Sequence, residues 1–430
     1  MAATATAGKS QNSNKALIHA AIVVAVGILA TTLAQPQMMG RIPLQNLLKN
    51  ELHVDRAANA AFFFWIGLAW YFKPLAGIVT DAFPLFGSRR KNYMLVATVL
   101  TLLSWVGLYF TPHQYNKLLW VCIVVDIFMV IVSTVVGAYM VEIAQLISGS
   151  GRLTSIRFVA QQLSYIIMGP SAGYLGSIAF GWTAVACGGV SFLLVPVAVL
   201  FLHEQRKTID SHELLGNAGK QLVKIGKATT MWAACGMMAM FYVAPGLFTA
   251  VFYKQQNDLH LNTQGQGFLQ FLYGVGGLVA AVGYGFVCRY VNLRKLLIGC
   301  LLFGTAANLG YLFYSSVSRA QAVESFNGFG YTLAELALMD LAVRATPAGS
   351  EGLGFSLAMS VRNVALFGSD WFGSKLLDYY HLPFHSLVLA NGVTSVLTVP
   401  LVFLLPKLLV SKKDTEAPEE AAAPKVAPQD

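Results

Sequence analysis

The amino-acid sequence predicts an all-α membrane protein with twelve transmembrane helices in two six-helix bundles. Three observations predict this fold class. Of the 430 residues, 56% are hydrophobic and only 11% are charged, whereas soluble proteins carry about 25% charged residues. Apolar runs of about 20 residues, long enough to cross a bilayer, follow one another along the chain. The basic residues lie between these runs, where they act as topology signals.

Composition also limits the function. A net charge of +9 would suit a nucleic-acid-binding protein, but the basic residues do not form one face of a soluble fold. The five cysteines are scattered within or beside apolar runs and show no CxxC spacing. Neither a disulfide framework nor a metal site is implied by such spacing. We therefore expect no nucleic-acid partner and no bound metal.

The first half begins with a polar cytoplasmic lead, residues 1–15, which lacks arginine. No small-residue cleavage site follows, so the first apolar run is expected to be retained as a transmembrane helix. Together with five further runs it forms a predicted N-terminal six-helix bundle over residues 16–202. The six predicted helices of this bundle cover residues 16–37, 57–80, 93–111, 118–147, 155–178 and 181–202.

The longest polar connection, residues 203–228, is predicted to be a cytoplasmic linker between the halves. A second six-helix bundle follows over residues 229–409, and the Ala/Pro/Glu-rich tail, residues 410–430, is predicted to be disordered. The longest runs, one in each half, are expected to tilt or to protrude. The predicted helices of the second bundle cover residues 229–252, 266–290, 295–316, 320–343, 351–377 and 384–409.

The distribution of Lys and Arg sets the predicted orientation. With both termini in the cytoplasm, most basic residues of the short loops and helix flanks, Arg157 among them, fall on the cytoplasmic side, as the positive-inside rule requires. A weak internal repeat supports the division into halves, because Gly77 precedes Arg89 by twelve residues and Gly283 precedes Arg294 by eleven. Parallel repeats with a site between them are the plan of many secondary carriers.

Ionisable residues inside predicted helices point to function, because charge at membrane depth is costly. Lys73 lies about 10 Å from the inner end of its helix. It either snorkels to the surface or faces a cavity, and the adjacent Pro74 weakens the helix and favours the cavity. Arg362 lies near mid-depth and is expected in a pocket or a buried ion pair. Gln161 and Gln162 are candidates to hydrogen-bond a ligand or a neighbouring helix.

Three acids, Asp126, Glu335 and Asp370, also lie within predicted helices. Burial favours the neutral form of a carboxyl group unless a cation pairs with it. Each acid is therefore either a proton-carrying group or one partner of a static ion pair, and the sequence leaves both possibilities open.

Charged residues at the cytoplasmic helix ends are candidates for an inner gate. Ion pairs between them would close the inner side in one state and break in another. The alternative is a solvated cluster that only sets topology. These gate candidates are Arg89, Arg90, Glu142, Arg152, Asp340 and Arg344.

The sequence does not point to an enzyme. It contains no Walker or HExxH motif, and no cofactor is implied. The glycine-rich run GQGFLQFLYGVGGLVAAVGYG lies inside a predicted helix with no strand before it. Its small residues therefore predict close helix packing and not a nucleotide-binding loop.

Two motifs resemble those of a known family. The stretch FKPLAGIVTDAFPLFGSRRKNYM resembles the signature of the major facilitator superfamily and, within it, the folate–biopterin transporter family. Its matching residues are Lys73, Pro74, Leu75, Gly77, Asp81, Pro84, Gly87, Arg89 and Arg90. The stretch RATPAGSEGLGFSLAMSVRN resembles a second motif of that family, with the matching residues Pro347, Gly349, Glu351, Ser360 and Asn363.

The resemblance implies the major facilitator fold, with two bundles around a central cavity that opens alternately to either side. It places Asp81 against the N-terminal end of the helix that starts near Gly352, where the helix dipole would stabilise its carboxylate. This contact would act as a cytoplasmic latch, which adds Asp81 and Glu351 to the gate candidates. Lys73 would lie just above the latch, where a cation could meet an anionic substrate.

The expected function is therefore secondary active transport, most simply proton-coupled transport of a folate-like or pteridine-like organic anion. Lys73 and Arg362 would bind its carboxylates, and Gln161, Gln162 and Asn363 complete the expected substrate-binding set. The alternatives are a transporter or exporter of another small solute, such as an amino acid, a sugar or a drug-like compound, and a non-transporting membrane receptor or assembly factor. The expected setting is a monomer in a bacterial inner membrane, with the substrate, protons and lipid as its partners.

Overall fold

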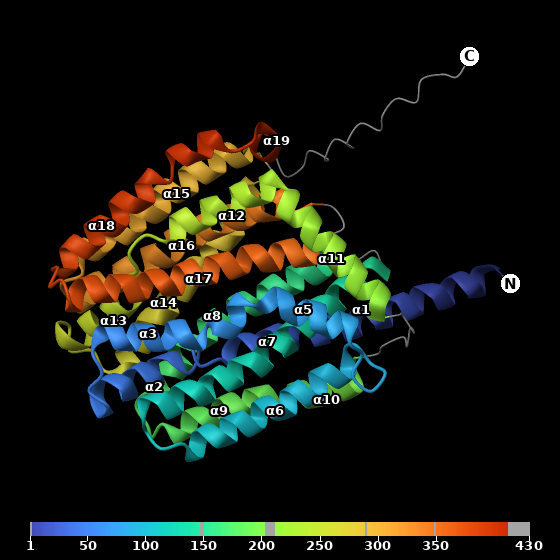
Figure 1. Ribbon diagram of the computed structural model, residues 1–430, viewed down its shortest axis with the longest axis horizontal. Coiled ribbons are helices and arrows are strands. Elements are labelled where there is room, and N and C mark those ends of the chain that lie inside the picture. Colours follow the sequence, from blue (N-terminus) through green and yellow to red (C-terminus); the bar gives the residue numbers. More distant parts are fainter. Residues whose placement is uncertain (1, 147–149, 203–210, 289, 348–349, 412–430) are drawn as a thin grey trace.

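The computed structural model describes residues 2–146, 150–202, 211–288, 290–347 and 350–411, and it is helical throughout this part of the chain (Figure 1). Within these ranges the one β feature is an isolated bridge between Leu85 and Ser88. The all-α prediction is confirmed.

The helices fall into two groups that lie one beside the other in Figure 1. The first group consists of α1 (Ala2–Leu33), α2 (Arg41–Asn46), the π-helix η1 (Leu47–Glu51), α3 (Arg56–Ile66), α4 (Leu68–Tyr71), α5 (Lys73–Ala82), α6 (Lys91–Phe110), α7 (Tyr115–Leu146), α8 (Ser150–Leu175), α9 (Gly181–Phe192) and α10 (Leu194–Leu200). The second consists of α12 (Thr229–Tyr242), α13 (Phe248–Asn257), α14 (Thr263–Val287), α15 (Leu293–Leu309), the 3-10 helix η2 (Gly310–Phe313), α16 (Val317–Ala345), α17 (Glu351–Asp378), α18 (Phe384–Leu397), the 3-10 helix η3 (Pro400–Leu404) and α19 (Lys407–Val410).

Helix α11 (Ser211–Lys227) joins the two groups and contacts α5 of the first half and both α12 and α17 of the second. The end of the bundle opposite α11 is called here the outer end (Figure 1). Four of the described helices have side-chain caps, in which Asp55, Asn262, Asn292 and Ser316 accept a hydrogen bond from the backbone N–H three residues later. Such caps satisfy backbone donors that a helix start leaves without partners.

Several predicted helices are interrupted, and two of the breaks lie beside the interior of the protein. The segment predicted over 57–80 is divided into α3, α4 and α5, with breaks at Gly67 and Phe72. Pro74 lies in the first turn of α5, where its missing N–H removes no helical hydrogen bond. The segment predicted over 229–252 is likewise divided between α12 and α13, across a link that contains Pro245. Both breaks allow side chains near them to face the interior.

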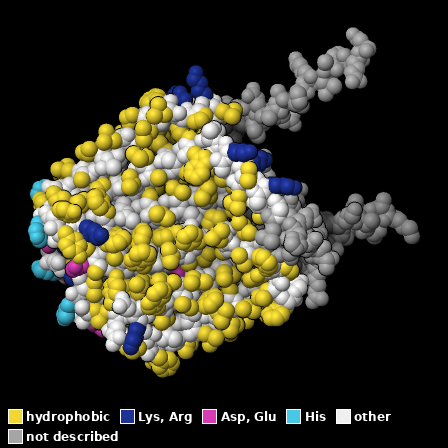
Figure 2. All heavy atoms as spheres, in the orientation of Figure 1, with side chains coloured by type: hydrophobic (Ala, Val, Ile, Leu, Met, Phe, Trp, Pro, Cys, Tyr) yellow, Lys and Arg dark blue, Asp and Glu magenta, His cyan; other side chains and the backbone are white. Residues whose placement is uncertain are grey.

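The surface is apolar, as a bilayer requires. Figure 2 shows hydrophobic side chains spread over one face, with most Lys, Arg and His side chains gathered near its two ends. By length and composition, six helices of the described chain could cross a membrane: Lys91–Phe110, Tyr115–Met140, Gly181–Leu200, Thr263–Val287, Leu293–Phe313 and Phe384–Leu404. The other predicted spans also coincide with helices, but these are broken or richer in polar side chains.

The buried apolar core is divided between the halves. Of four buried clusters, two consist of residues between Ala20 and Leu202 and two of residues between Ile225 and Val410. Each half therefore has its own packed interior and can move as a unit, since packed cores resist deformation.

Glycines bring the two halves together along α8 and α14. A Cβ atom on Gly173 of α8 would lie 2.8 Å from the carbonyl oxygen of Thr263, and Gly169 approaches the backbone of Gly267 as closely. The glycine-rich run predicted to permit close packing therefore does so, because no larger residue fits at this crossing.

Candidate functional site

A large cavity of about 830 Å³ lies between the halves. Its size falls in the range of small-molecule sites. Its lining comes from both halves and extends from Arg41 near the outer end to Arg90, Gln221 of α11 and Ser350 near the other end. Among the described residues its charged lining consists of Arg41, Lys73, Arg90, Arg157 and Arg362 with Glu324 and Glu335.

Lys73 lines this cavity and does not extend along the helix to the surface. Its Nζ donates a hydrogen bond to Ser133 Oγ on α7 at 3.0 Å. It also lies 5.0 Å from the centre of the Trp70 ring. In the described part of the chain no carboxylate pairs with it, so its charge is available to a ligand.

Arg157 of α8 is a second cation in the cavity, and the sequence analysis treated it only as a topology signal. Its guanidinium lies 6.0 Å from the ring of Phe355 on α17 and within electrostatic range of Lys73. No carboxylate of the described residues pairs with it. A sequence signal was present, because Arg157, Gln161 and Tyr165 recur at intervals of four residues and so share one face of α8.

Arg362 forms an ion pair with Glu335. Its Nη2 lies 2.6 Å from Glu335 Oε1 on α16, and its Nη1 donates to Asn363 Oδ1 at 3.0 Å. Its guanidinium also lies over the ring of Tyr242, 5.1 Å from the ring centre. For Glu335, of the two possibilities left open by the sequence, the structure displays the ion pair.

Asp370 is also ion-paired, and across the two halves. Its carboxylate accepts hydrogen bonds from the backbone N–H and the hydroxyl of Thr249 on α13, at 2.9 and 2.7 Å. Arg41 of α2 lies 3.6 Å away and stacks against the rings of Phe63 and Phe248. Asp370 therefore belongs to the contact between the halves and does not line the cavity.

Asp126 differs from the other two acids. It is fully buried on α7, and its Oδ2 accepts hydrogen bonds from Gln37 Nε2 at 2.6 Å and from Trp70 Nε1 at 3.1 Å. Its Oδ1 has no hydrogen-bond partner among the described residues. No basic side chain of these residues pairs with it, so of the three acids Asp126 alone is held by neutral donors.

The remaining polar candidates line the cavity. Gln161 Nε2 donates to Tyr165 OH at 3.2 Å, and Gln162 and Asn363 also face the cavity. The structure adds polar lining that the sequence analysis did not single out. The buried lining atoms without a hydrogen-bond partner among the described residues include Gln270 Oε1, Asn327 Oδ1, Tyr242 OH and Tyr331 OH.

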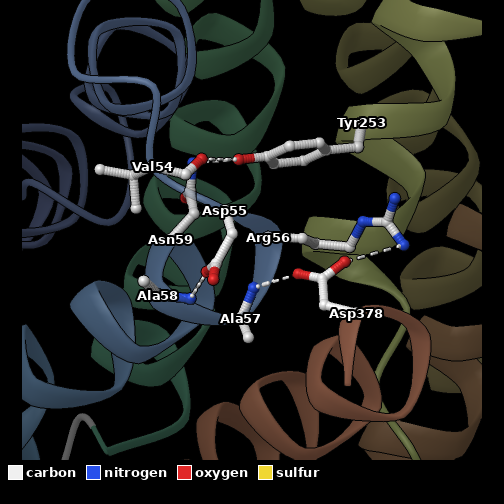
Figure 3. A network of polar contacts seen from close by, with 8 residues as sticks. All are labelled: Val54, Asp55, Arg56, Ala57, Ala58, Asn59, Tyr253 and Asp378. Atoms are coloured by element: carbon white, nitrogen blue, oxygen red, sulfur yellow. Dashed lines mark hydrogen bonds and ion pairs between the residues drawn. The ribbon is translucent and has the colours of Figure 1, made fainter. Parts of the chain in front are cut away.

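A network closes the outer end between the halves (Figure 3). Tyr253 of α13 donates to the carbonyl oxygen of Val54 at 2.8 Å. Asp378 of α17 accepts from the backbone N–H of Ala57 at 2.8 Å and lies 3.7 Å from Arg56 Nη1. We call this network, together with Lys49, Gln256 and the Arg41–Asp370 pair, the outer closure.

Lys49 completes the outer closure from η1. Its Nζ donates to Gln256 Oε1 at 2.8 Å and to Asn257 Oδ1 at 2.5 Å in the second half. Burial lowers the pKa of Lys49, and the positive charge of Arg56 lowers it further. The sequence analysis did not predict this closure, because each of its bonds joins residues from opposite halves.

The predicted inner gate is described only in part. Arg344 and Asp340 form an ion pair at 2.8 Å within α16, and Tyr284 of α14 donates to Asp340 at 3.2 Å, so these contacts stay inside the second half. Arg89 and Arg90 have interaction partners, and Arg90 lines the cavity.

The other gate candidates lie on described helices, but their side chains are outside the described residues. These are Asp81, Glu142, Arg152 and Glu351.

Comparison with known proteins identifies the family. The chain matches the BT1 family over residues 36–423. It is 25% identical to the probable folate-biopterin transporter 2 of Arabidopsis thaliana, over 86% of this chain and 79% of the relative. It is 24% identical to the folate-biopterin transporter of Synechocystis sp., over 86% of this chain and 78% of the relative.

The fold is also that of solved transporters. The crystal structure of a D-xylose-proton symporter superposes on this chain with a TM-score of 0.69 at 15% identity, and covers 90% of this chain and 98% of its own. The predicted major facilitator fold is therefore confirmed.

Proposed function

The chain belongs to the BT1 family, and on this premise we propose that it is a proton-coupled transporter of a folate-like or pteridine-like organic anion. It is an integral, multi-pass membrane protein that takes a small-molecule substrate, and it is a transporter and not an enzyme. The finer assignments are part of the proposal: a monomer in a bacterial inner membrane, with both termini in the cytoplasm.

The observation that carries the proposal is the pair of cations, Lys73 and Arg157, in one cavity without a carboxylate partner among the described residues. Buried charge is costly unless it is paired. A substrate with carboxylates would supply the missing partners through charge-assisted hydrogen bonds, which are stronger than neutral ones. A folate has two such groups in its glutamate tail.

The part of the lining that comes from the second half suits the pteridine end of the molecule. A pterin ring is flat and carries amino, keto and ring-nitrogen groups. Gln270 and Asn327 offer acceptors and the hydroxyls of Tyr242 and Tyr331 offer donors, all buried in the lining. Such a site would discriminate by hydrogen bonding, because an analogue without matching groups would leave these atoms without partners.

Two features support alternating access. The outer closure joins the halves at one end, while the cavity lining continues to Arg90 and Gln221 at the other. The apolar cores lie within the halves. Rocking one half against the other would therefore break polar contacts at the outer end and leave the cores intact.

Asp126 is the favoured proton carrier. A group that binds and releases a proton must not be held permanently charged by a cation. Glu335 and Asp370 are ion-paired, whereas Asp126 meets only Gln37 and Trp70. Since Trp70 also stacks against Lys73, one residue would connect the proton site to the substrate site.

The test is uptake of labelled folate and of labelled biopterin into proteoliposomes, with and without an inward proton gradient. We expect gradient-stimulated uptake that Lys73→Ala abolishes. The matched control is Lys117→Ala, which removes an exposed lysine at the start of α7. Uptake of neither compound by correctly inserted protein would reject the proposal, and uptake that ignores the gradient would reject proton coupling alone.

A further inference from the structure

A second buried acid, Glu324 of α16, has no role in the site described so far. It is 6% exposed and lines the central cavity. Its Oε1 accepts hydrogen bonds from Tyr314 OH at 2.8 Å and from Gln255 Nε2 at 3.3 Å, and its Oε2 accepts from Tyr311 OH at 3.3 Å. Three neutral donors therefore surround the carboxylate.

No Lys, Arg or His of the described chain pairs with Glu324. The titratable groups that face it are tyrosines, Tyr311 and Tyr314 from the η2 region and Tyr273 from α14. On α13, the nearby Lys254 is paired with Asp258 at 2.6 Å. The carboxylate is thus free of a permanent counter-charge.

The titratable groups of the remaining packed helices lie elsewhere. Tyr242 of α12 and Arg362 of α17 gather around Glu335, which is eleven residues, or about 16 Å, further along α16. The positive charge of Arg362 therefore acts on Glu335, and Glu324 is left with its neutral donors.

The surroundings of Glu324 repeat those of Asp126 in the other half. Helix α7 contains the fourth predicted span of the first half, and α16 contains the fourth of the second. Asp126 accepts from Gln37, which follows α1, and Glu324 accepts from Gln255 of α13, at the end of the first span of its half. Halves related by a parallel repeat are expected to place equivalent groups in this way.

The position of Glu324 offers a path to both sides. Tyr311 and Tyr314 line a second pocket, of about 380 Å³, together with Lys254 and His385. Glu324 itself lines the central cavity. The two tyrosine hydroxyls and the carboxylate therefore form a hydrogen-bonded chain between the two spaces, along which a proton can pass.

Glu324 also connects to the outer closure through α13. Gln255, which donates to Glu324, stands in the sequence between Tyr253 and Gln256. Both of these residues belong to the outer closure and form hydrogen bonds to the first half. Tyr253 donates to the Val54 carbonyl oxygen, and Gln256 accepts from Lys49. A carboxylate only accepts hydrogen bonds, whereas its protonated form must also donate one, so a bound proton would rearrange the bonds that hold α13.

We propose that Glu324 is a second proton-binding site, the counterpart of Asp126, and that the transporter moves two protons in each cycle. The step is a simple association: a proton from solvent adds to one carboxylate oxygen of Glu324, and leaves from it later, with no change of oxidation state. This inference rests on the proposed proton-coupled transport for its stoichiometry, but not for the proton site itself.

The first experiment tests the site without any substrate. Infrared spectra of the full-length protein in liposomes are recorded as the pH is changed, and the C=O band of protonated carboxyl groups is followed. We expect Glu324→Gln to remove one component of the titrating band and Asp126→Asn to remove another. Glu324→Asp keeps an acid and should keep a component. A Glu324→Gln band identical to that of the wild type would overturn the proposal.

The second experiment measures stoichiometry. With the membrane potential held at zero and a gradient of one pH unit, each coupled proton allows about tenfold accumulation of substrate. We expect labelled folate to accumulate about a hundredfold in the wild type and about tenfold in Glu324→Gln. Tenfold accumulation by both would overturn the two-proton cycle and leave the proposed symport standing.

Failure of the proposed transport function would give a different result from failure of the two-proton cycle. In that case the wild type would accumulate neither folate nor biopterin, while the infrared titration would still decide whether Glu324 binds a proton. A melting curve of each variant shows whether that variant is still folded.

Discussion

Arg41 in the first half lies 3.6 Å from Asp370 in the second, and this ion pair joins the halves at the outer end. Both side chains are largely shielded from solvent and the Arg41 guanidinium is also covered by two aromatic rings. An ion pair in this position stabilises one conformation of the transporter over another, which makes its effect measurable as a shift between states.

Removing the charge of Arg41 should shift the protein towards a state open at the outer end. Arg41→Gln leaves Asp370 bonded to Thr249 but without its cation, and a shift of about 1.4 kcal/mol would change the ratio of states tenfold. The measurement is the rate at which a membrane-impermeant thiol reagent, added outside, modifies a cysteine placed at Val251 in the cavity wall. Faster labelling than in Lys117→Ala is expected, and an unchanged rate would mean that the pair does not hold the closure.

Loss of Arg157 should weaken the binding of folate and spare biopterin. A hydrogen bond to a charged group contributes about 1.5–3 kcal/mol, so Arg157→Ala should raise the folate Kd about tenfold or more. Biopterin has no carboxylate and should bind equally well to both proteins. Equilibrium binding to purified protein gives both values, and equal losses for the two compounds would place Arg157 away from the carboxylates. Arg157→Lys, which keeps the charge, should recover part of the folate affinity.

Breaking the pair of Arg362 and Glu335 should destabilise the fold more than removing both charges. Glu335→Gln leaves the Arg362 guanidinium without its 2.6 Å partner, and an uncompensated buried charge costs about 3 kcal/mol or more. The double variant Arg362→Met with Glu335→Met should lie closer to the wild type in Tm. Thermal melting in detergent measures this, and a double variant that melts lower than either single variant would contradict the argument.

Asp126→Asn should reduce the gradient-driven accumulation of folate and leave folate exchange across the membrane intact. The amide can keep the contact with Trp70 as an acceptor but cannot carry a proton. At a gradient of one pH unit we expect folate accumulation to fall from about a hundredfold to about tenfold, because only Glu324 still carries a proton, while exchange of internal for external folate continues. Asp258→Asn, at an exposed position beside Lys254, is the matched control. Accumulation by Asp126→Asn equal to that of the wild type would remove this residue from proton coupling.

A larger side chain at Gly173 should force α8 and α14 apart. Its Cβ would already lie 2.8 Å from the Thr263 carbonyl oxygen, and overpacking of this kind costs about 1–3 kcal/mol. Gly173→Leu should therefore disfavour the outer-closed state and increase labelling of Val251→Cys from outside. Gly189→Leu in α9, where nothing lies within 4 Å of the added Cβ, should leave the labelling unchanged.

Much of the fold followed from local properties of the chain. The length and apolarity of a segment decide whether it can span a bilayer, so each predicted span coincides with one helix or with consecutive shorter helices. The cost of a charge at membrane depth is likewise local, and it singled out Lys73, Asp126 and Arg362 before any contact was known. The helix breaks were less visible, because a proline such as Pro74 can start a helix as well as interrupt one.

The candidate site was predictable only in part. Arg157 was assigned to topology because it lies near a helix end, and its distance from that end does not reveal that it faces the cavity. Glu324 was overlooked for the same reason. Their functional interest depends on the lack of a charged partner, which is a property of the surroundings and not of the residue.

The sequence alone determines which segments are apolar enough to span a bilayer, that they are helical, and which charged residues lie within them. Each of these properties depends on neighbours only a few residues away. The pairing of the charged residues does not. Gln37 reaches Asp126 across 89 positions, and Arg41 meets Asp370 from the opposite half. Whether an intramembrane acid becomes an ion pair, as at Glu335, or remains available to a proton, as at Asp126, depends on which side chains the packed helices bring within hydrogen-bond distance, because only close partners offset the cost of burying a charge.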